Sequence, residues 1–239
     1  MEQRIEFQKN RLINGNPVLH LDSSCRLGNG IQELDDDSIK TYAHEFDHRD
    51  ANITIAHFIP ASGSGSRMFD SLFQFIIQPR PNEETLEFVE HFINCAGDFA
   101  FYNKLPQHFK DELNNGTLDI QEFIKLLLSE NGFNFGNLPK GLIPFHRYGN
   151  FIVNPFQEHI LQGVSISGER THFHFTINSR FESRIHNSIK ILKDITGIDF
   201  KHSFSEQHPA TDAIAFNENL EPLRDERGEY ITRPAGHGA

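Results

Sequence analysis

The chain of 239 residues has no tryptophan and only two cysteines, and these absences narrow its identity. Cys25 and Cys95 lie far apart without paired spacing, which excludes a disulfide scaffold and a cysteine zinc site. No apolar run approaches the length of about 18 residues that suggests a membrane span, and the N-terminus lacks the apolar segment of a signal peptide. We therefore expect a cytoplasmic protein without a membrane partner.

Positive charge is scarce as well. With a net charge of −11 the chain lacks the basic footprint of a nonspecific nucleic-acid binder, so we expect no nucleic-acid polymer as a partner. A small anionic ligand held by a few local cations is compatible with this balance. Phenylalanine, by contrast, is abundant: the chain has 23 Phe residues and is 37% hydrophobic, which is enough for a substantial core.

The order of apolar and turn segments predicts an α/β fold. Residues 53–60 form a β-branched, apolar strand candidate that is buried on both faces, and a turn of small residues follows at 61–67. Apolar residues then recur at helical spacing. Further along, the spacing of a strand at 172–177, a helix at 180–196 and a strand at 198–205 is typical of a βαβ unit in a parallel or mixed sheet.

The polar residues 1–50 are expected to form an N-terminal helical extension, and residues 51–239 the α/β domain. A helical insertion is expected within this domain at residues 83–131. Its three helices are predicted at residues 83–96, 106–113 and 119–129. The other expected elements are helices at 31–48 and 155–162, strands at 213–216 and 229–233, and a loop at 133–148.

The turn Ala-Ser-Gly-Ser-Gly-Ser-Arg at residues 61–67 is the strongest candidate for chemistry. Glycines let the backbone approach an anion with free N–H groups, and the N-terminus of a following helix favours negative charge. The guanidinium of Arg67 is placed to bind phosphate oxygens. The spacing is neither a Walker A loop nor Gly-x-Gly-x-x-Gly, and an ordinary tight turn is the alternative. We predict a phosphate-binding turn between a strand and a helix.

Lys140 is a second candidate, because the flanking Pro139 and Gly141 hold it on a defined backbone path. A solvated surface lysine is the alternative.

Two histidine patterns have spacings that occur in metal-binding sites. His44 and His48 match His-Glu-x-x-His, but the stretch runs straight into a strand and offers no third ligand, so we do not expect a metalloprotease. His172 and His174 would share one face of a strand, as in some metal sites. No partner carboxylate accompanies them, so we expect packing histidines.

Four segments, in order, resemble the UDP-sugar pyrophosphorylases of the sugar nucleotidyltransferase superfamily. Residues 62–68 resemble the Gly-x-Gly-Thr-Arg loop of that group, with Ser for Thr, and residues 139–141 its Pro-Lys-Gly element. Residues 173–179 resemble the strand that ends in Met-Thr-Ser. Residues 204–210 and 234–238 resemble the motif pair Gln-x-x-x-Pro and Pro-x-Gly-Asn/His-Gly.

The segments at residues 142–146 and 157–159 extend the likeness to an uncharacterised bacterial family, a domain of unknown function whose members are nucleotidyltransferase-like. The resemblance implies a Rossmann-like nucleotidyltransferase fold of the GT-A type, in which helices flank a mixed sheet. It also implies a reaction. A sugar 1-phosphate attacks the α-phosphate of a nucleoside triphosphate, with UTP favoured, and pyrophosphate leaves with the help of Mg²⁺.

Under this resemblance Arg67 would hold the triphosphate, and Lys140 would neutralise charge on the transferred phosphoryl group. Gln207 and residues 236–238 would contact the base. The residues implied to bind the nucleotide are Ser62, Gly63, Ser64, Gly65, Ser66, Thr176, Gln207, Gly236, His237 and Gly238.

The metal-binding aspartate and the sugar-binding half of such enzymes would follow residue 238. We therefore expect this chain to be the nucleotide-binding part of a longer protein, with no metal ligand of its own. A non-catalytic nucleotide- or phosphate-binding module is one alternative, and a structural domain that kept only the fold is another.

Overall fold

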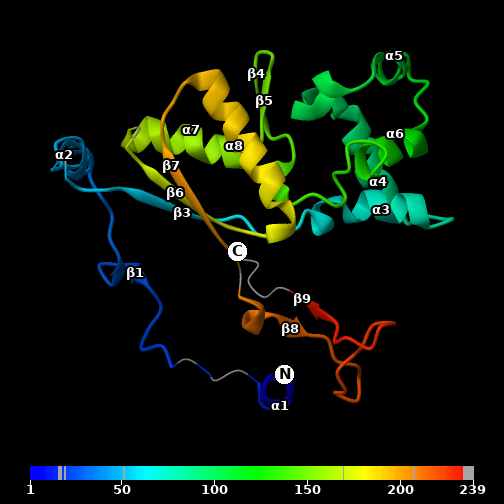
Figure 1. Cartoon of the computed structure of the whole chain (residues 1–239), viewed down its shortest axis with the longest axis horizontal. Helices are drawn as coiled ribbons and strands as arrows, with labels where there is room; N and C mark the ends of the chain where they lie inside the picture. The colour runs from blue at the N-terminus through cyan, green and yellow to red at the C-terminus, as the bar shows by residue number, and fades with distance from the viewer. Residues whose placement is uncertain (16–17, 19, 51, 169, 207, 234–239) are drawn as a thin grey trace. The chain divides into compact units, whose positions relative to one another are not determined.

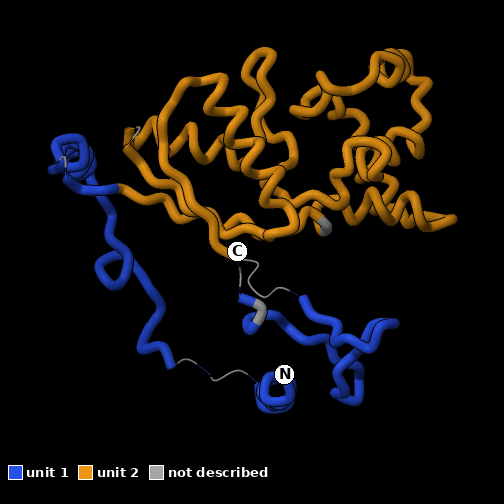
Figure 2. The backbone as a smooth tube through the Cα atoms, viewed as in Figure 1, with its two compact units in different colours: residues 1–54, 208–236 blue, residues 55–207, 237–239 orange. Residues whose placement is uncertain are grey.

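The computed structural model describes residues 1–233 except 16, 17, 19, 51, 169 and 207. The described part is mixed α/β, with eight α-helices, one three-stranded parallel sheet and three two-stranded sheets. The chain divides into two compact units (Figure 2). We call Met1–Thr54 with His208–Gly236 the terminal unit, and Ile55–Gln207 with His237–Ala239 the sheet unit. Residues 208–236, which the sequence assigns to the α/β domain, thus group with the N-terminal residues.

The sheet unit is built on a parallel sheet in the order β3-β6-β7. These strands are β3 (Ala56–Pro60), β6 (His172–Ile177) and β7 (Lys201–Glu206), and the helices α7 (Pro155–Ser167) and α8 (Glu182–Thr196) lie on one face of the sheet (Figure 1). The predicted βαβ unit is therefore confirmed as β6–α8–β7, with both strands parallel.

The strand β6 alternates strictly between its two faces. Phe173, Phe175 and Ile177 are buried beneath α7 and α8, whereas the residues between them are half-buried on the other face. Phe58 of β3 pairs with His174 on that other face and is 67% exposed. The expectation that the first strand is buried on both faces is wrong, because α7 and α8 pack on the same side of the sheet.

The apolar cluster between the sheet and these two helices is called here the sheet core. Its fully buried members include Phe156, Ile160, Phe173 and Ile189. A Cβ atom on Gly163 of α7 would lie only 2.3 Å from Cε1 of Phe173, so a glycine is required for the helix to lie this close to the sheet.

The helical insertion lies between β3 and β6 in the chain. The helices α4 (Glu83–Asn94), α5 (Gln107–Asn115) and α6 (Ile120–Leu128) confirm the three predicted helices to within a few residues. The helix α3 (Asp70–Ile77) packs with them, as the apolar spacing after the turn predicts. Together they bury a second cluster, called here the helical core, whose most buried members are Leu72, Val89, Phe123, Ile124 and Leu127.

Side chains cap two of these helices. Asp119 accepts a hydrogen bond from the backbone N–H of Glu122 at 3.0 Å, and Asn82 accepts one from Thr85 at 2.8 Å. Each cap satisfies a backbone donor that the first turn of a helix leaves without a partner.

The antiparallel pairs form separate two-stranded sheets, so the expected single mixed sheet is not observed. One pair is the hairpin of β4 (His146–Tyr148) and β5 (Phe151–Val153), which projects at the top of Figure 1. The other joins β8 (Ala213–Ile214) to β9 (Thr232–Arg233). Both strands predicted at 213–216 and 229–233 are thus present, but each is only two residues long.

The terminal unit contains α1 (Glu2–Asn14), α2 (Asp36–Asp47) and the short parallel pair β1 (Arg26–Leu27) and β2 (Gly30–Ile31). The helix α1 is tied to β8 and the residue before it by three hydrogen bonds. Nη2 of Arg4 and Nε2 of Gln8 donate to the Asp212 carbonyl at 3.0 and 2.8 Å, and Oε1 of Gln8 accepts from the Ile214 N–H at 2.8 Å. Throughout the described residues, no α-helix combines the length and the apolar character needed to cross a bilayer.

Candidate functional site

The predicted phosphate-binding turn begins at the carboxyl edge of the parallel sheet. The strand β3 ends at Pro60, and the N–H of Ala61 donates a hydrogen bond of 2.8 Å to the carbonyl of Thr176. The turn therefore leaves the sheet beside the end of its central strand. In open α/β sheets, ligands bind in the crevice outside this edge.

The two glycines of the turn, Gly63 and Gly65, differ in whether the structure leaves room for a side chain. Gly65 is buried, and a Cβ atom there would lie 3.2 Å from Cδ1 of Ile143 and 3.3 Å from the Leu138 carbonyl oxygen. A Cβ atom on Gly63 would meet nothing within 4 Å, and neither glycine has a positive φ. Among the described residues, the backbone N–H groups of Ser62 and Gly63 have no hydrogen-bond acceptor, so they can donate to an anion.

One part of the sequence-based argument for this turn is wrong. The turn does not lead directly into an α-helix, because a 3-10 helix, η1 (Ser66–Phe69), intervenes. The helix α3 begins only at Asp70. The carboxylate of Asp70 therefore already occupies the first turn, where the helix dipole would favour an anion. Any anion at the turn must therefore be bound by loop N–H groups and by cations, and not by a helix N-terminus.

The structure brings the turn together with the second predicted segment, residues 139–141. The N–H of Lys140 donates to the Gly63 carbonyl at 3.1 Å, and the N–H of Gly65 donates to the Leu138 carbonyl at 3.4 Å. These two bonds flank an antiparallel bridge between Ser64 and Pro139. Two segments separated by the whole helical insertion thus form one paired backbone unit.

Arg67 and Lys140 are both exposed on this paired unit. Within the described part of the chain, no acidic side chain or other group forms an ion pair or a hydrogen bond with either side chain. Two cations that no side chain of the described residues neutralises therefore lie on the two partners of the same backbone pair.

Other predicted nucleotide-binding residues are placed differently. Thr176 supplies the carbonyl that holds Ala61, while its hydroxyl lies 3.3 Å from Oγ of Ser205 on the uncovered face of the sheet. The side chain of Thr176 is therefore engaged with the neighbouring strand. Gln207, Gly236, His237 and Gly238 lie outside the described residues.

The histidines of β6 are hydrogen-bonded to serines of β7. The two ring nitrogens of His174 lie 2.8 Å from Oγ of Ser203 and 2.9 Å from Oγ of Ser205, and Nε2 of His172 lies 2.8 Å from Ser203. Because both nitrogens of His174 have protein partners, the arrangement supports the expectation of packing histidines. The rings of His44 and His48 stack at 3.9 Å, and Nδ1 of His48 bonds the His44 carbonyl.

In the residues that the structure describes, no group of three or more His, Cys, Asp or Glu side chains could hold a metal ion. The Mg²⁺ that the resemblance implies therefore has no preformed ligand set among them.

A buried cluster that the sequence analysis missed surrounds Glu158, in the first turn of α7. Glu158 is 5% exposed. Its carboxylate accepts hydrogen bonds from the Tyr148 hydroxyl at 2.9 Å and from Nε2 of Gln162 at 3.0 Å, and Nδ1 of His146 lies 3.3 Å away. The signal that was overlooked is the Gly149-Asn150 pair between apolar residues, which is typical of a two-residue hairpin turn.

Electrostatics in this cluster favour an ionised carboxylate. Burial raises the pKa of Glu158, but the hydrogen bonds from Gln162, Tyr148 and His146 together outweigh burial and hold the pKa below its ordinary value. The hydrogen bond to this carboxylate in turn raises the pKa of the Tyr148 hydroxyl. Glu158 is thus a buried negative charge that hydrogen bonds from the hairpin and from Gln162 stabilise.

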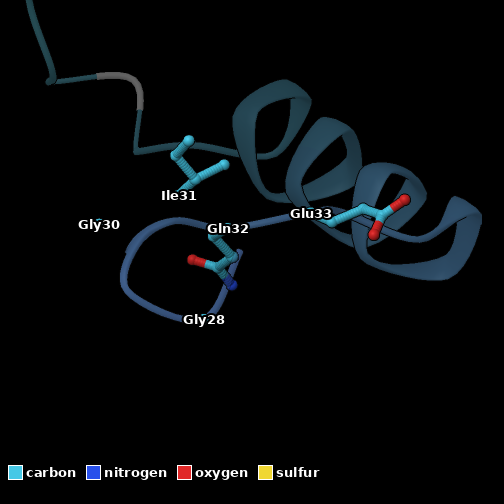
Figure 3. Close-up of a pocket in the computed structure, with 5 residues that line it drawn as sticks. All are labelled: Gly28, Gly30, Ile31, Gln32 and Glu33. Carbon is cyan, nitrogen blue, oxygen red and sulfur yellow. The ribbon is translucent and has the colours of Figure 1, made fainter. Parts of the chain in front are cut away.

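The terminal unit carries a shallow concavity of its own, lined by Gly28, Gly30, Ile31, Gln32 and Glu33 (Figure 3). All five residues are exposed, and the one charged residue among them is acidic. This hollow therefore lacks a cationic side chain among the five residues that line it.

A family model described as "Domain of unknown function (DUF4301)" matches residues 1–239, and the chain therefore belongs to this family. No curated protein and no solved structure matches the chain. Membership in a family of unknown function is thus confirmed, and the description of the family carries no activity with it.

Proposed function

We propose that this member of the DUF4301 family binds a nucleoside phosphate at the paired segments 62–67 and 139–141. The observation that carries the proposal is the backbone pairing between them, in which the Lys140 N–H donates to the Gly63 carbonyl at 3.1 Å. Each segment is a candidate for phosphate contact on its own residues, and they meet at the carboxyl edge of a parallel sheet.

The local charge supports the same ligand. The chain has a net charge of −11, yet Arg67 and Lys140 are exposed on the paired segments without an acidic partner among the described residues. The free N–H groups of Ser62 and Gly63 add hydrogen-bond donors. Arginine, lysine and backbone N–H groups are the donors that most often bind phosphate oxygens.

We further propose, on the resemblance to UDP-sugar pyrophosphorylases, a sugar nucleotidyltransferase reaction in a Rossmann-like fold. An oxygen of a sugar 1-phosphate would form a bond to the α-phosphorus of UTP, and the bond to the departing pyrophosphate would break. Arg67 would hold the triphosphate, and Lys140 would offset charge on the transferred group. Since the described residues offer no preformed Mg²⁺ site, the proposal routes no step through a metal.

Binding is tested by calorimetric titration of the full chain with UTP, alongside ATP and pyrophosphate. We expect Arg67→Ala and Lys140→Ala each to weaken UTP binding by about 10- to 100-fold, since each removes a charge-assisted hydrogen bond. Arg80→Ala and Lys201→Ala are matched controls: both residues are exposed cations of the sheet unit, and Lys201 begins β7 at the opposite, amino edge of the sheet. The proposal would be contradicted if none of the three ligands binds. It would also be contradicted if the control variants lose as much UTP affinity as Arg67→Ala and Lys140→Ala.

Turnover is tested separately, because a non-catalytic nucleotide-binding module would share the ligand. The chain is incubated with UTP, Mg²⁺ and a panel of sugar 1-phosphates, and pyrophosphate is measured. We expect release that requires both substrates and is lost in Lys140→Ala. Binding of UTP without release would leave the binding proposal standing and contradict the transferase reaction.

A further inference from the structure

The first turn of α7 contacts the Lys140 segment within the lysine's own 3-10 turn, η4 (Lys140–Leu142), and again beyond it. Within η4, Gly141 lies directly against the ring of Phe156, where a Cβ atom would be 2.4 Å from Cε2. On the far side, Glu158 holds the side chains of His146 and Tyr148. The segment that carries Lys140 is therefore attached at two points to two residues of one helical turn.

This helical turn is itself fixed by hydrogen bonds. Asn154 and Gln157 form a reciprocal capping box at the start of α7. The buried Nε2 of Gln157 donates to the Ser188 carbonyl at 2.9 Å, and Nδ2 of Asn154 donates to the Ser188 hydroxyl at 2.7 Å. Because Ser188 belongs to α8, the turn is tied to the second helix of the sheet core and offers a rigid support.

The contacts of Glu158 also orient His146. An ionised carboxylate only accepts hydrogen bonds, so Nδ1 of His146, 3.3 Å from Oε2, is the donor of this pair. The side chain of His146 is 48% exposed, and its Nε2 has no partner among the described residues. Glu158 thus sets the orientation of His146, while Tyr148 donates to both carboxylate oxygens, at 2.9 and 3.1 Å.

We propose that Glu158 is a positioning residue for the anion site, because it anchors the hairpin that continues from η4 and so fixes where Lys140 presents its ammonium group. The inference rests on the proposed binding of a nucleoside phosphate. Without this anchor, the segment keeps its pairing with the turn at Gly63 but loses its attachment on the far side of η4. Lys140 then samples more positions, and the ligand must restrict them on binding.

A double-mutant cycle on UTP affinity tests this role. We expect Glu158→Gln to weaken UTP binding about fivefold in the wild-type background, which is the size of coupling seen between residues that share a structural unit. In the Lys140→Ala background we expect a change of less than about twofold, because the positioned group is gone. Tyr148→Phe, which removes only the hydroxyl that donates to Glu158, is expected to weaken binding by about two- to threefold and guards against a Glu158 variant that fails to fold.

Thr171→Val serves as the control for a merely structural effect. Thr171 is 1% exposed, and its hydroxyl donates to the Gly168 carbonyl at 2.7 Å, at the amino end of β6. We expect this variant to lower the melting temperature without weakening UTP binding. A nitrogen-15 NMR spectrum of the histidine rings adds a signature independent of the ligand: we expect the ring-nitrogen shifts of His146 in the wild type to report its hydrogen bond to Glu158, and to change in Glu158→Gln.

The outcomes separate the two proposals. If Lys140→Ala weakens UTP binding as expected but Glu158→Gln binds like the wild type, the positioning role is wrong and the binding site stands. Equal weakening by Glu158→Gln in both backgrounds also overturns the positioning role. If the wild type binds no phosphate ligand, the proposed function and the inference that rests on it fail together.

Discussion

The sheet unit contains two apolar cores that are assembled in different ways. The helical core is built from a continuous stretch of chain, from Phe69 to Ile143. The sheet core draws on residues before and after that stretch, from Ile59 to Phe204, and on Leu142 near its end. The helical core is thus inserted into the sheet core, and the chain has to cross between them twice.

The candidate site lies on the two segments of chain that link these cores. The outward crossing runs from Ala61, which packs on the sheet core, to Phe69 in the helical core. The return crossing runs through residues 138–143, where Leu138 and Ile143 pack on the helical core and Leu142 packs on the sheet core. These two crossings are the segments that pair through Gly63 and Lys140. Cations and free N–H groups gather there because neither core can accommodate them.

The largest expected effect comes from truncating one core at a time. Phe123 of the helical core and Phe173 of the sheet core are both fully buried, so each substitution by alanine should lower the free energy of unfolding by about 3–5 kcal/mol. We expect hydrogen exchange to rise mainly in the core that carries the substitution, because contiguous units open separately. Equal loss of protection in both cores would show that they form one cooperative unit.

A smaller effect is expected where the return crossing meets the sheet core. Gly141→Ala places a methyl group 2.4 Å from the buried ring of Phe156, so we expect a loss of about 1–3 kcal/mol in denaturant unfolding, together with weaker UTP binding. Gly63→Ala is the matched control for the unfolding measurement on the outward crossing, because its Cβ atom has open space. A Gly141→Ala protein as stable as the wild type would show that the crossing is not held tightly.

Next in size is the charge that holds the hairpin to α7. The pKa of Glu158 is held below its ordinary value in the folded protein, so its stabilisation is present above the pKa of the unfolded chain, about 4.3, and is lost as the pH falls through the folded pKa. Glu158→Gln should therefore cost about 1 kcal/mol at pH 7 and progressively less below about pH 4. Melting temperatures of both proteins across pH 3–8 check this, and a constant difference would contradict it.

The smallest effect is expected on the uncovered face of the sheet. Phe58 is 67% exposed there and stacks on His174 with ring centroids 5.5 Å apart. We expect Phe58→Ser to change the free energy of unfolding by no more than about 0.5 kcal/mol, as for other surface positions. A loss several times larger would show that this face of the sheet core is covered in solution.

Local sequence determined most of the elements. Period-3.6 apolar spacing and the Asp119 cap specified the insertion helices, and alternating residues in 172–177 specified the central strand. These signals are short-range, because capping and periodicity act within a few residues. The hairpin of β4 and β5 was missed, since its strands are only three residues long and its turn begins at Gly149, with a φ of 59°.

The sequence by itself thus determined that the chain is α/β. It also identified the glycine-rich turn with Arg67, and Lys140, as two separate candidates for phosphate contact. Tertiary structure alone decided that the turn and the lysine segment pair, that one face of the sheet stays uncovered, and that Glu158 is buried beneath the hairpin. The physical reason is that the pairing, the uncovered face and the burial of Glu158 depend on contacts between segments far apart in the chain or on the side of the sheet on which helices pack. Such long-range contacts leave no periodic or local pattern in the sequence.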